Sequence, residues 1–346
     1  MRQWGRRAEE QRVPLSGTIE LTRRCNLRCI HCYVGEQDEQ WRRREDELTT
    51  ADWLSILDQV TAAGCLYLLI TGGEPLLRPD FPEIYRRAKG NGLLVTVFSN
   101  GTTLADNMLA LFTELPPLQV EITLYGASAG VYEGITGVPG SYARCLAGIE
   151  GLARAGVRFA LKTMLMTRNR HEFAAIEELA RGYGVKFRFD AAIHPRFDGD
   201  RAPLDLRVSP AEVVAADFAD DEKTGKWREF YGRFGGGTPS DLLYQCGAGL
   251  TGFHVDPFGR LQLCLMAPEP GCDLRHDTFS EGWQGAVPRT RARKAPANYR
   301  CLACEVRALC GYCPGFFRLE NGSEEVASEF LCSLGRQRLA ALSGPS

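Results

Sequence analysis

The stretch LSGTIELTRRCNLRCIHCY, residues 15–33, places a strand-like segment directly before a loop that carries three cysteines. Residues 15–22 are rich in apolar and β-branched side chains and predict a strand. Cys25, Cys29 and Cys32 follow with the spacing C-x3-C-x2-C. A structural zinc site takes four ligands and disulfides take cysteines in pairs, whereas three thiolates can hold an iron–sulfur cube with one iron left open.

This strand opens a regular alternation of strand and helix patterns. Strands are expected at residues 15–22, 66–71, 93–100, 118–126, 157–166 and 185–193. Helices are expected between them, at residues 49–64, 79–92, 103–115, 141–156 and 170–184. Strict alternation favours a parallel sheet with right-handed crossovers, and six units are too few for a closed eightfold barrel. The sequence therefore predicts the α/β class, as a partial (β/α)6 TIM-like barrel with a C-terminal cysteine-rich extension.

The alternation stops near Pro195, which predicts three parts of the chain. Residues 1–195 form the barrel core, and residues 196–245 form a linker with one helix at about 210–230. Residues 246–346 are rich in cysteine, glycine and turns, with little periodicity. A segment with so little apolar core of its own needs bound metal to hold its structure.

Composition excludes several classes of protein. The chain has 346 residues, 44% of them hydrophobic, and a formal net charge of -2, so no general attraction to nucleic acid or acidic membranes is expected. No secretory signal is visible, and the longest apolar run, at residues 65–70, is far too short to cross a bilayer. We expect a cytoplasmic protein. Its 13 cysteines would stay reduced there, which points to metal binding.

A second motif, Gly72-Gly73-Glu74-Pro75, follows the second predicted strand. Glycines permit close approach of a ligand to the backbone, and Glu74 can accept hydrogen bonds from an ammonium group. The cysteine triad with this GGEP turn resembles the radical S-adenosylmethionine (SAM) superfamily. The resemblance implies that the triad binds the [4Fe-4S] cluster that cleaves SAM, and that the turn binds the methionine amine. A partial zinc site completed by His31 is the alternative, and it leaves the GGEP turn unexplained.

The resemblance extends less directly to other side chains. SAM contacts are expected from residues at or after the later strands: Asn100, Thr123, Arg144 and Lys162. Substrate contacts are expected from residues near the ends of the fourth and sixth strands: Tyr125, Arg188, Asp190 and His194. Each of these side chains could instead cap an element, form an ion pair or lie on the surface.

The C-terminal cysteines resemble the SPASM extension of peptide maturases, which usually holds two auxiliary iron–sulfur clusters. By that resemblance, one [4Fe-4S] cluster has the ligands Cys301, Cys304, Cys310 and Cys332, which we call the quartet. The other, nearer the active site, has the ligands Cys246, Cys264 and Cys313, with its fourth position open or filled by Cys272. The sequence departs from the family pattern, because the spacing before Cys313 is x2 where x3 is usual. A zinc ribbon of Cys301, Cys304, Cys310 and Cys313 is the alternative.

Together these motifs predict an enzyme with SAM and three [4Fe-4S] clusters, one catalytic and two auxiliary. It would cleave SAM reductively to a 5′-deoxyadenosyl radical and abstract hydrogen from a ribosomally synthesised peptide, which then receives a thioether or carbon–carbon crosslink. Radical oxidation or decarboxylation of a small molecule, in antibiotic, sugar or haem-type biosynthesis, is the alternative. A non-catalytic zinc-stabilised binding module or electron carrier is a third reading.

Two protein partners are expected from this function. The first is an electron donor such as flavodoxin or ferredoxin. Only 24 residues precede the triad, too few for a leader-peptide-binding domain, so a peptide substrate would need either a separate leader-binding protein or short-range recognition.

Overall fold

The computed structural model describes residues 7–236 and 240–343. The chain forms two compact units. The barrel unit comprises residues 7–164, 168–190 and 246–291, and the cysteine-rich unit comprises the remaining described residues. No helix in the described ranges combines the length and apolar character needed to cross a membrane.

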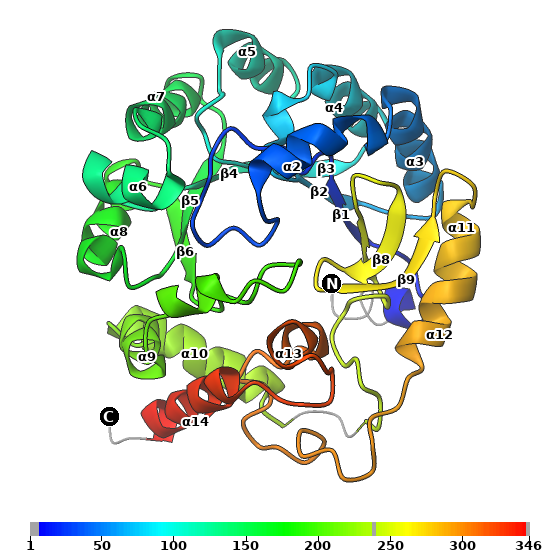
Figure 1. The fold of residues 1–346 in the computed structure, drawn as a ribbon, viewed down its shortest axis with the longest axis vertical. Coiled ribbons are helices and arrows are strands. Elements are labelled where there is room, and N and C mark those ends of the chain that lie inside the picture. The colour runs from blue at the N-terminus through cyan, green and yellow to red at the C-terminus, as the bar shows by residue number, and fades with distance from the viewer. Residues whose placement is uncertain (1–6, 237–239, 344–346) are drawn as a thin grey trace. The chain divides into compact units, whose positions relative to one another are not determined.

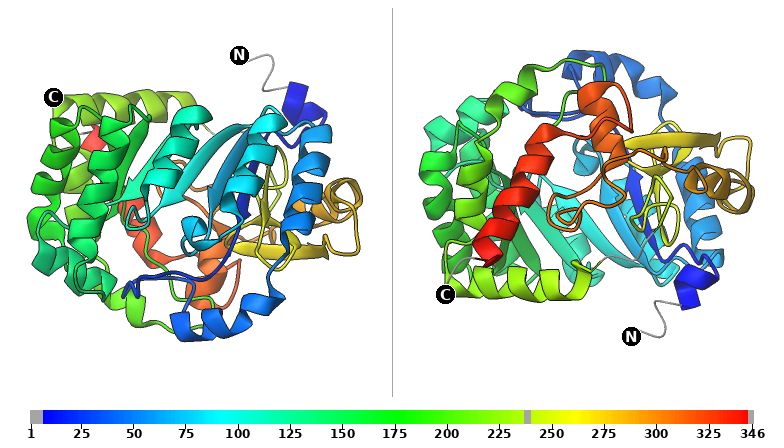
Figure 2. Two further views of the ribbon diagram at one scale, coloured as in Figure 1. Left: turned by 90° about the horizontal axis from the view of Figure 1, so that it is seen from above. Right: turned by 90° about the horizontal axis from the view of Figure 1, so that it is seen from below.

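Six parallel strands form the centre of the barrel unit, as the sequence predicted (Figure 1). They are β1 (Ser16–Glu20), β2 (Tyr67–Thr71), β3 (Leu94–Ser99), β4 (Gln119–Thr123), β5 (Phe159–Met164) and β6 (Lys186–Asp190). Each pairs with its neighbour along the chain, and the left view of Figure 2 shows them side by side. The predicted α/β class and TIM-like barrel are confirmed.

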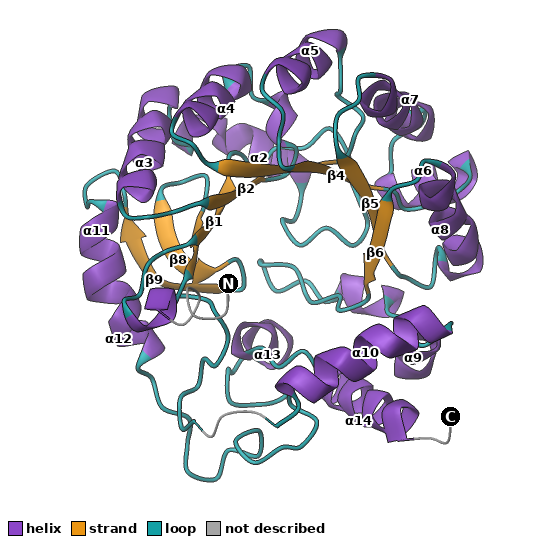
Figure 3. Cartoon of the chain, turned by 180° about the vertical axis from the view of Figure 1, so that it is seen from behind, coloured by secondary structure: helices purple, strands orange, loops and turns teal. Residues whose placement is uncertain are grey.

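Helices lie outside this row of strands, where Figure 3 shows them in purple. The five predicted ones are α3 (Thr50–Ala62), α4 (Phe81–Gly90), α5 (Asp106–Glu114), α7 (Ser141–Arg154) and α8 (Phe173–Gly182). The sequence analysis missed α2 (Gln37–Arg42), α6 (Ala129–Thr136) and the 3-10 turns η1 (Arg43–Asp46), η2 (Pro75–Leu77) and η3 (Arg170–Glu172). These short elements lie in the connections after the strands, where the site is built.

Strand periodicity explains why these residues form a two-layered unit. In β3 the side chains of Val95 and Val97 are fully buried, whereas those of Thr96 and Phe98 are half-buried. Successive side chains of a strand point to opposite faces, so one face packs against the helices and the other carries the mixed polar residues. Helix α3 meets the first face with buried side chains at helical spacing, among them Trp53 and Val60.

The sheet continues past β1, which the sequence analysis did not foresee. Strand β7 (Gly252–Val255) pairs in parallel with β1, and β8 (Arg260–Cys264) and β9 (Ala267–Asp273) follow antiparallel. Helix α11 (Phe279–Glu281), the π-turn η5 (Gly282–Ala286) and helix α12 (Val287–Arg291) complete the unit. Residues 246–291 thus fold with the barrel, so the compact units differ from the predicted division at 195 and 245. The four residues of β7 are too few to show a strand period.

The cysteine-rich unit contains η4 (Ala202–Leu206) and the helices α9 (Pro210–Asp217), α10 (Asp221–Phe234), α13 (Pro314–Asn321) and α14 (Glu329–Ser343). One helix was predicted over residues 210–230, and the structure has two. The break occurs because the side chain of Asp220 accepts a hydrogen bond from the backbone N–H of Lys223 at 2.8 Å and starts α10 afresh. Helix α14 packs against α9, where Arg338 pairs with Asp217 at 2.8 Å.

Candidate functional site: a cysteine loop at the carboxyl end of the barrel strands

Backbone hydrogen bonds fix the loop that carries the cysteine triad at its start and in its middle. At its start, the backbone N–H of Cys25 donates to Oε1 of Gln37 in α2 at 2.6 Å. In its middle, the N–H groups of Arg28 and Ile30 donate to the carbonyls of Thr136 and Ile135, the last turn of α6. The two helices that the sequence analysis missed therefore position the triad.

The three thiols are half-buried and lie close enough to affect one another's pKa. Burial and, to a smaller extent, the nearby Glu74 carboxylate raise the pKa of Cys25 to about 12. Burial also raises the pKa of Cys29 well above its ordinary value, with Cys32 and Cys25 adding to the effect. Thiols of this kind become thiolates when bound metal supplies positive charge, so the donor set fits an iron–sulfur cluster.

In the described ranges, no three His, Cys, Asp or Glu side chains are grouped closely enough to hold one metal ion. The ring of His31 instead lies edge-on to Tyr125, with centroids 4.8 Å apart. Burial lowers the pKa of His31 to about 4. Tyr125, predicted to contact substrate, also lies within hydrogen-bonding reach of the Cys29 sulfur, so it belongs to the triad's surroundings.

The GGEP turn packs against the start of the cysteine loop. The backbone N–H of Gly73 donates to the carbonyl of Thr22 at 2.7 Å, and that of Glu74 donates to the carbonyl of Arg24 at 2.9 Å. A Cβ on Gly72 would lie 2.3 Å from the oxygen of Thr22, and one on Gly73 would lie 2.3 Å from that of Arg24. The protein's own backbone therefore requires both glycines. Pro75 is buried and opens η2.

The Glu74 carboxylate is committed to hydrogen bonds within the protein. It is fully buried and accepts hydrogen bonds from Leu76 N–H at 3.2 Å, Ser99 Oγ at 3.0 Å and Asn100 N–H at 2.7 Å. Burial raises the pKa of Glu74 to about 7, against the lowering effect of these donors. Glu74 thus joins the ends of β2 and β3 beside the triad. Its contact with the methionine amine stays a prediction.

Among the predicted SAM-binding residues, Asn100 makes a hydrogen bond to a sulfur of the cysteine triad. Its Nδ2 lies 3.7 Å from Cys25 Sγ and 2.9 Å from Oδ1 of Asn26. Its Oδ1 accepts hydrogen bonds from the backbone and the hydroxyl of Thr102. The end of β3 is thereby coupled to the cysteine loop after β1.

Lys162 and Arg188 lie side by side on paired positions of β5 and β6 and share one carboxylate, Glu121 of β4. Arg188 is 2.6 Å from Glu121 Oε2, and the ammonium of Lys162 is 3.9 Å from the same oxygen. Burial and the neighbouring Arg188 lower the pKa of Lys162 well below its ordinary value. Sequence reasoning missed Glu121, although its place two residues before Thr123 puts it on the same face of β4.

The other predicted contacts are scattered. Thr123 ends β4 and is half-buried. Arg144 is exposed on α7 and donates to the carbonyl of Pro139. Asp190 ends β6 and is exposed. His194 belongs to the cysteine-rich unit, where its ring stacks on Phe197.

A buried polar cluster beside β1 was also missed. Glu20 of β1 is fully buried, and its Oε2 lies 3.9 Å from Nε2 of His254 in β7. Gln262 links His254 to Asp256, and Arg23 lies 3.9 Å from both Glu20 and Asp256. Burial raises the pKa of Glu20 to about 7 and lowers that of His254 to about 4. The one signal in the sequence was an acidic residue between Ile19 and Leu21 at the end of the first predicted strand.

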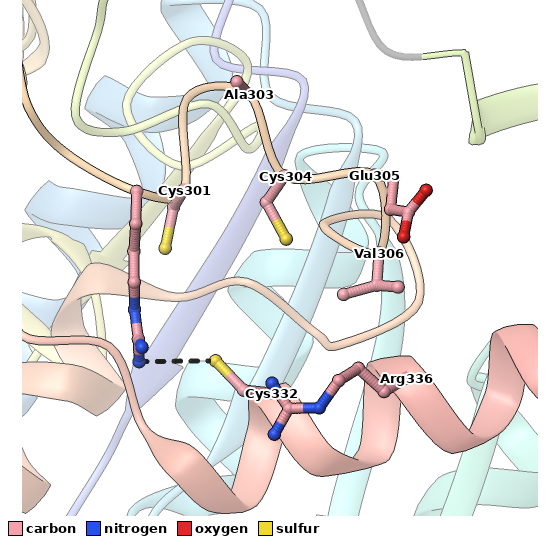
Figure 4. A pocket seen from close by; sticks show the side chains of 8 residues that line it. Cys301, Ala303, Cys304, Glu305, Val306, Cys332 and Arg336 are labelled. Carbon is pink, nitrogen blue, oxygen red and sulfur yellow. Dashed lines mark hydrogen bonds between the residues drawn. The ribbon is translucent and has the colours of Figure 1, made fainter.

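The cysteine-rich unit brings the predicted quartet together. Cys301, Cys304 and Cys332 line a pocket of about 440 Å³ with Arg300 and Arg336, as Figure 4 shows. Cys310 is buried beside them, and burial and the charges of those three thiols raise its pKa to about 12. Cys332 comes from the first turn of α14.

Cys313 has a different position, which bears on the zinc-ribbon alternative. It begins α13, and its sulfur accepts a hydrogen bond from Phe316 N–H at 3.4 Å. Cys332, rather than Cys313, lines the pocket with Cys301 and Cys304. This grouping favours the interleaved ligand set over a ribbon.

The remaining candidate ligands lie in the barrel unit. Cys246 is exposed, and Cys264 ends β8. Cys272 of β9 pairs with Leu261, and its sulfur would lie 3.5 Å from a Cβ on Gly282 of η5. Leu261 and Cys264 are on opposite faces of β8, so Cys272 faces the helical turn and Cys264 does not. Cys272 thus packs against η5, and its role as a fourth ligand stays a prediction.

Comparisons with known proteins agree with this geometry. The model of the Radical SAM superfamily matches residues 19–180. The mycofactocin maturase MftC of Mycobacterium ulcerans is 30% identical over 305 residues, which cover 84% of this chain and 80% of that protein. An AdoMet-dependent heme synthase of Methanosarcina barkeri is 29% identical over 317 residues, covering 85% and 89% of the two chains.

Solved structures show the same fold. SuiB of Streptococcus suis bound to S-adenosylmethionine superposes with a TM-score of 0.70 at 14% identity, over 96% of this chain and 78% of that one. Native anSMEcpe with bound AdoMet and a peptide gives a TM-score of 0.66 at 14% identity, over 95% and 96%. With its cysteine triad, its GGEP turn and a near-full-length relative at 30% identity, this chain belongs to the radical SAM superfamily.

Proposed function

We propose that this enzyme cleaves SAM reductively at the Cys25, Cys29 and Cys32 cluster and modifies a ribosomally synthesised peptide by forming a thioether or carbon–carbon crosslink. The observation that carries the proposal is the packing of the GGEP turn against the loop of three half-buried, interacting thiols. The bound cluster and SAM supply the one-electron chemistry that yields a 5′-deoxyadenosyl radical.

The chain's own residues hold and shield this site. Gly72, Gly73 and Pro75 shape the turn where the methionine amine would bind, and Glu74 fixes that turn to the end of β3. Asn100 donates toward a cluster sulfur and so orients the loop. Thr123, at the end of β4, and Lys162, on β5, are the next proposed SAM contacts. Arg144, which is exposed on α7, is the weakest candidate of the predicted set.

Substrate contacts are assigned to the same end of the barrel. Tyr125 lies against the triad loop, and Arg188 extends from β6 with more than half of its side chain exposed. A substrate group with negative charge would be attracted to Arg188, because its guanidinium is half-exposed beside Glu121. Asp190 ends β6 and belongs to this set, whereas His194, the fourth residue proposed from the sequence, lies in the cysteine-rich unit.

Both auxiliary centres are assigned from the cysteine pattern of the sequence, and the pocket lined by Cys301, Cys304 and Cys332 supports the first of them. We assign Cys301, Cys304, Cys310 and Cys332 to one auxiliary [4Fe-4S] cluster, and Cys246, Cys264 and Cys313 to a second with an open fourth position. An electron donor such as flavodoxin or ferredoxin and a leader-binding protein are the proposed partners. The peptide class is supported by MftC, which is named a maturase, and by the fold of SuiB, which has been solved with its precursor peptide SuiA.

A small-molecule substrate is the second candidate, because several relatives carry haem-type names. They include the AdoMet-dependent heme synthase and the Pre-heme d1 synthase of Dinoroseobacter shibae, which is 27% identical over 328 residues. Oxidation or decarboxylation of a porphyrin side chain would then replace peptide crosslinking.

The test is the formation of 5′-deoxyadenosine by anaerobically purified, reconstituted enzyme given SAM and dithionite. We expect product from the wild type and from Cys65→Ala, a buried thiol outside the clusters, and none from Cys32→Ala. Product from the Cys32→Ala variant would refute the assignment of the triad. Mass spectrometry with peptides encoded beside the gene, and with iron coproporphyrin, then separates the two substrate classes.

A further inference from the structure

One arginine at the quartet pocket reaches a sulfur. Arg300 directly precedes Cys301, and its Nη2 lies 3.7 Å from Cys332 Sγ, the contact drawn as a dashed line in Figure 4. The same nitrogen lies 2.6 Å from Oε1 of Glu329 and 3.4 Å from the carbonyl of Ala327. A single guanidinium nitrogen is therefore shared between a proposed cluster ligand and a carboxylate.

A second arginine provides a natural comparison. Arg336 lines the same pocket and lies 3.7 Å from Oε2 of Glu329. Its side chain is exposed to a similar degree as that of Arg300, at 61% against 55%. Among the hydrogen bonds of the described chain, Arg336 makes none to Cys332. The two arginines thus place the same charge at one pocket, and Arg300 alone of the pair adds a bond to sulfur.

That difference matters for the redox state of a bound cluster. The reduction potential of an iron–sulfur cluster depends on hydrogen bonds to its sulfurs, on local charge and on solvent exposure. Reduction adds negative charge, which a cation that donates to a ligand sulfur stabilises. Glu329 acts against this stabilisation, because its carboxylate accepts a hydrogen bond from the same guanidinium nitrogen of Arg300.

We propose that Arg300 is a redox-tuning residue, which raises the reduction potential of the auxiliary cluster held by Cys301, Cys304, Cys310 and Cys332, and that Glu329 limits this effect. The proposal rests on the assignment of the quartet under the proposed function. It gives the Arg300–Glu329 pair a role beyond fastening the first turn of α14 to the loop before Cys301.

The test is a potentiometric titration followed by electron paramagnetic resonance on the full-length chain. The triad is replaced by alanine, so that the catalytic cluster does not contribute, and the quartet signal is the one lost on adding Cys304→Ala. We expect Arg300→Met to make reduction about tenfold less favourable, a shift of about 59 mV to more negative potential for one electron. Arg300→Lys should restore most of the shift, and Arg336→Met should shift the potential less than half as far.

Glu329→Gln is the second, independent arm, because it frees Arg300 without removing it. We expect the potential to become more positive, whereas a purely structural clamp would change stability and leave the potential where it is. Equal shifts in Arg300→Met and Arg336→Met, or an unchanged potential in Glu329→Gln, would overturn the proposal. If Arg300→Met loses the cluster, the Arg300→Lys and Glu329→Gln variants decide the matter.

Failure of the underlying assignment has a separate signature. If Cys304→Ala leaves iron and sulfide content unchanged, the quartet holds no cluster, and both the assignment and the tuning role are wrong. Deoxyadenosine formation by the enzyme with an intact triad is measured independently and reports on the catalytic proposal.

Discussion

The substitution Gly73→Ala tests how tightly the GGEP turn controls the cysteine loop. The new Cβ would lie 2.3 Å from the carbonyl oxygen of Arg24 and 2.5 Å from that of Arg23, both backbone atoms. Ordinary contacts begin near 3.4 Å, so the two backbones must separate by about 1 Å. The hydrogen bond from Glu74 N–H to Arg24, now 2.9 Å, would then lengthen beyond hydrogen-bonding range.

The cost follows from two contributions. Overpacking of this kind costs about 1–3 kcal/mol. A buried backbone group left without its partner costs about 1–3 kcal/mol more. We therefore expect a loss of about 2–6 kcal/mol in the free energy of unfolding of the apoprotein, measured with urea, and a displaced triad that retains little iron after reconstitution.

Gly134→Ala is the matched control for this experiment. Gly134 lies inside α6, and no atom lies within 4 Å of the Cβ that alanine would add. Replacement of a helical glycine by alanine at such a position should stabilise by about 0.5–1 kcal/mol and leave the iron content unchanged. If Gly73→Ala unfolds like Gly134→Ala and binds iron fully, the reasoning from backbone contact is refuted.

Three further outcomes are expected. The pKa of Glu20 is about 7 in the folded protein against 4.5 in the unfolded chain, so the folded protein keeps a proton that the unfolded chain releases, and stability falls as the pH rises from 4.5 to 7. Glu20→Gln should remove this decline, which amounts to up to about 3 kcal/mol. The measurement is the free energy of unfolding in urea at pH 5 and 8, and an unchanged pH dependence in the variant would contradict the prediction. Cys272→Ala should keep its iron while Cys264→Ala loses some, by iron and sulfide analysis; equal losses would restore Cys272 as a ligand. Asn100→Ala should slow deoxyadenosine formation about tenfold through the lost donor to a cluster sulfur, whereas Asn107→Ala, exposed on α5, should not.

The sequence predicted the barrel well because its signals are local. Each of the six strands and five helices has its own periodicity, and the cysteine triad and GGEP turn are contiguous motifs at strand ends. The same locality explains the misses. Helices α2 and α6 have six and eight residues, too few to show a clear repeat.

Contacts between distant segments were not predictable from one sequence. Glu20 lies near His254 because β7 pairs with β1, and no local sequence pattern predicts that pairing. Similarly, Arg300 precedes a cysteine motif and reads as a surface residue until α14 brings Cys332 to it. The role of Glu74 was predicted from its chemistry alone, and the structure adds that three donors of the protein already occupy it.

The pairing of β7 with β1 also determines when the sheet can be completed during synthesis of the chain. Ser16 bonds to Thr251, 235 positions along the chain, so β1 keeps one open edge throughout most of synthesis. At about 5–20 residues per second, the ribosome needs roughly 10–50 s to deliver the missing strand. An open strand edge is a template for pairing with the wrong chain. A shortened version that stops after β6 would carry that edge permanently, beside the loop that must hold the cluster, and should aggregate when it is expressed.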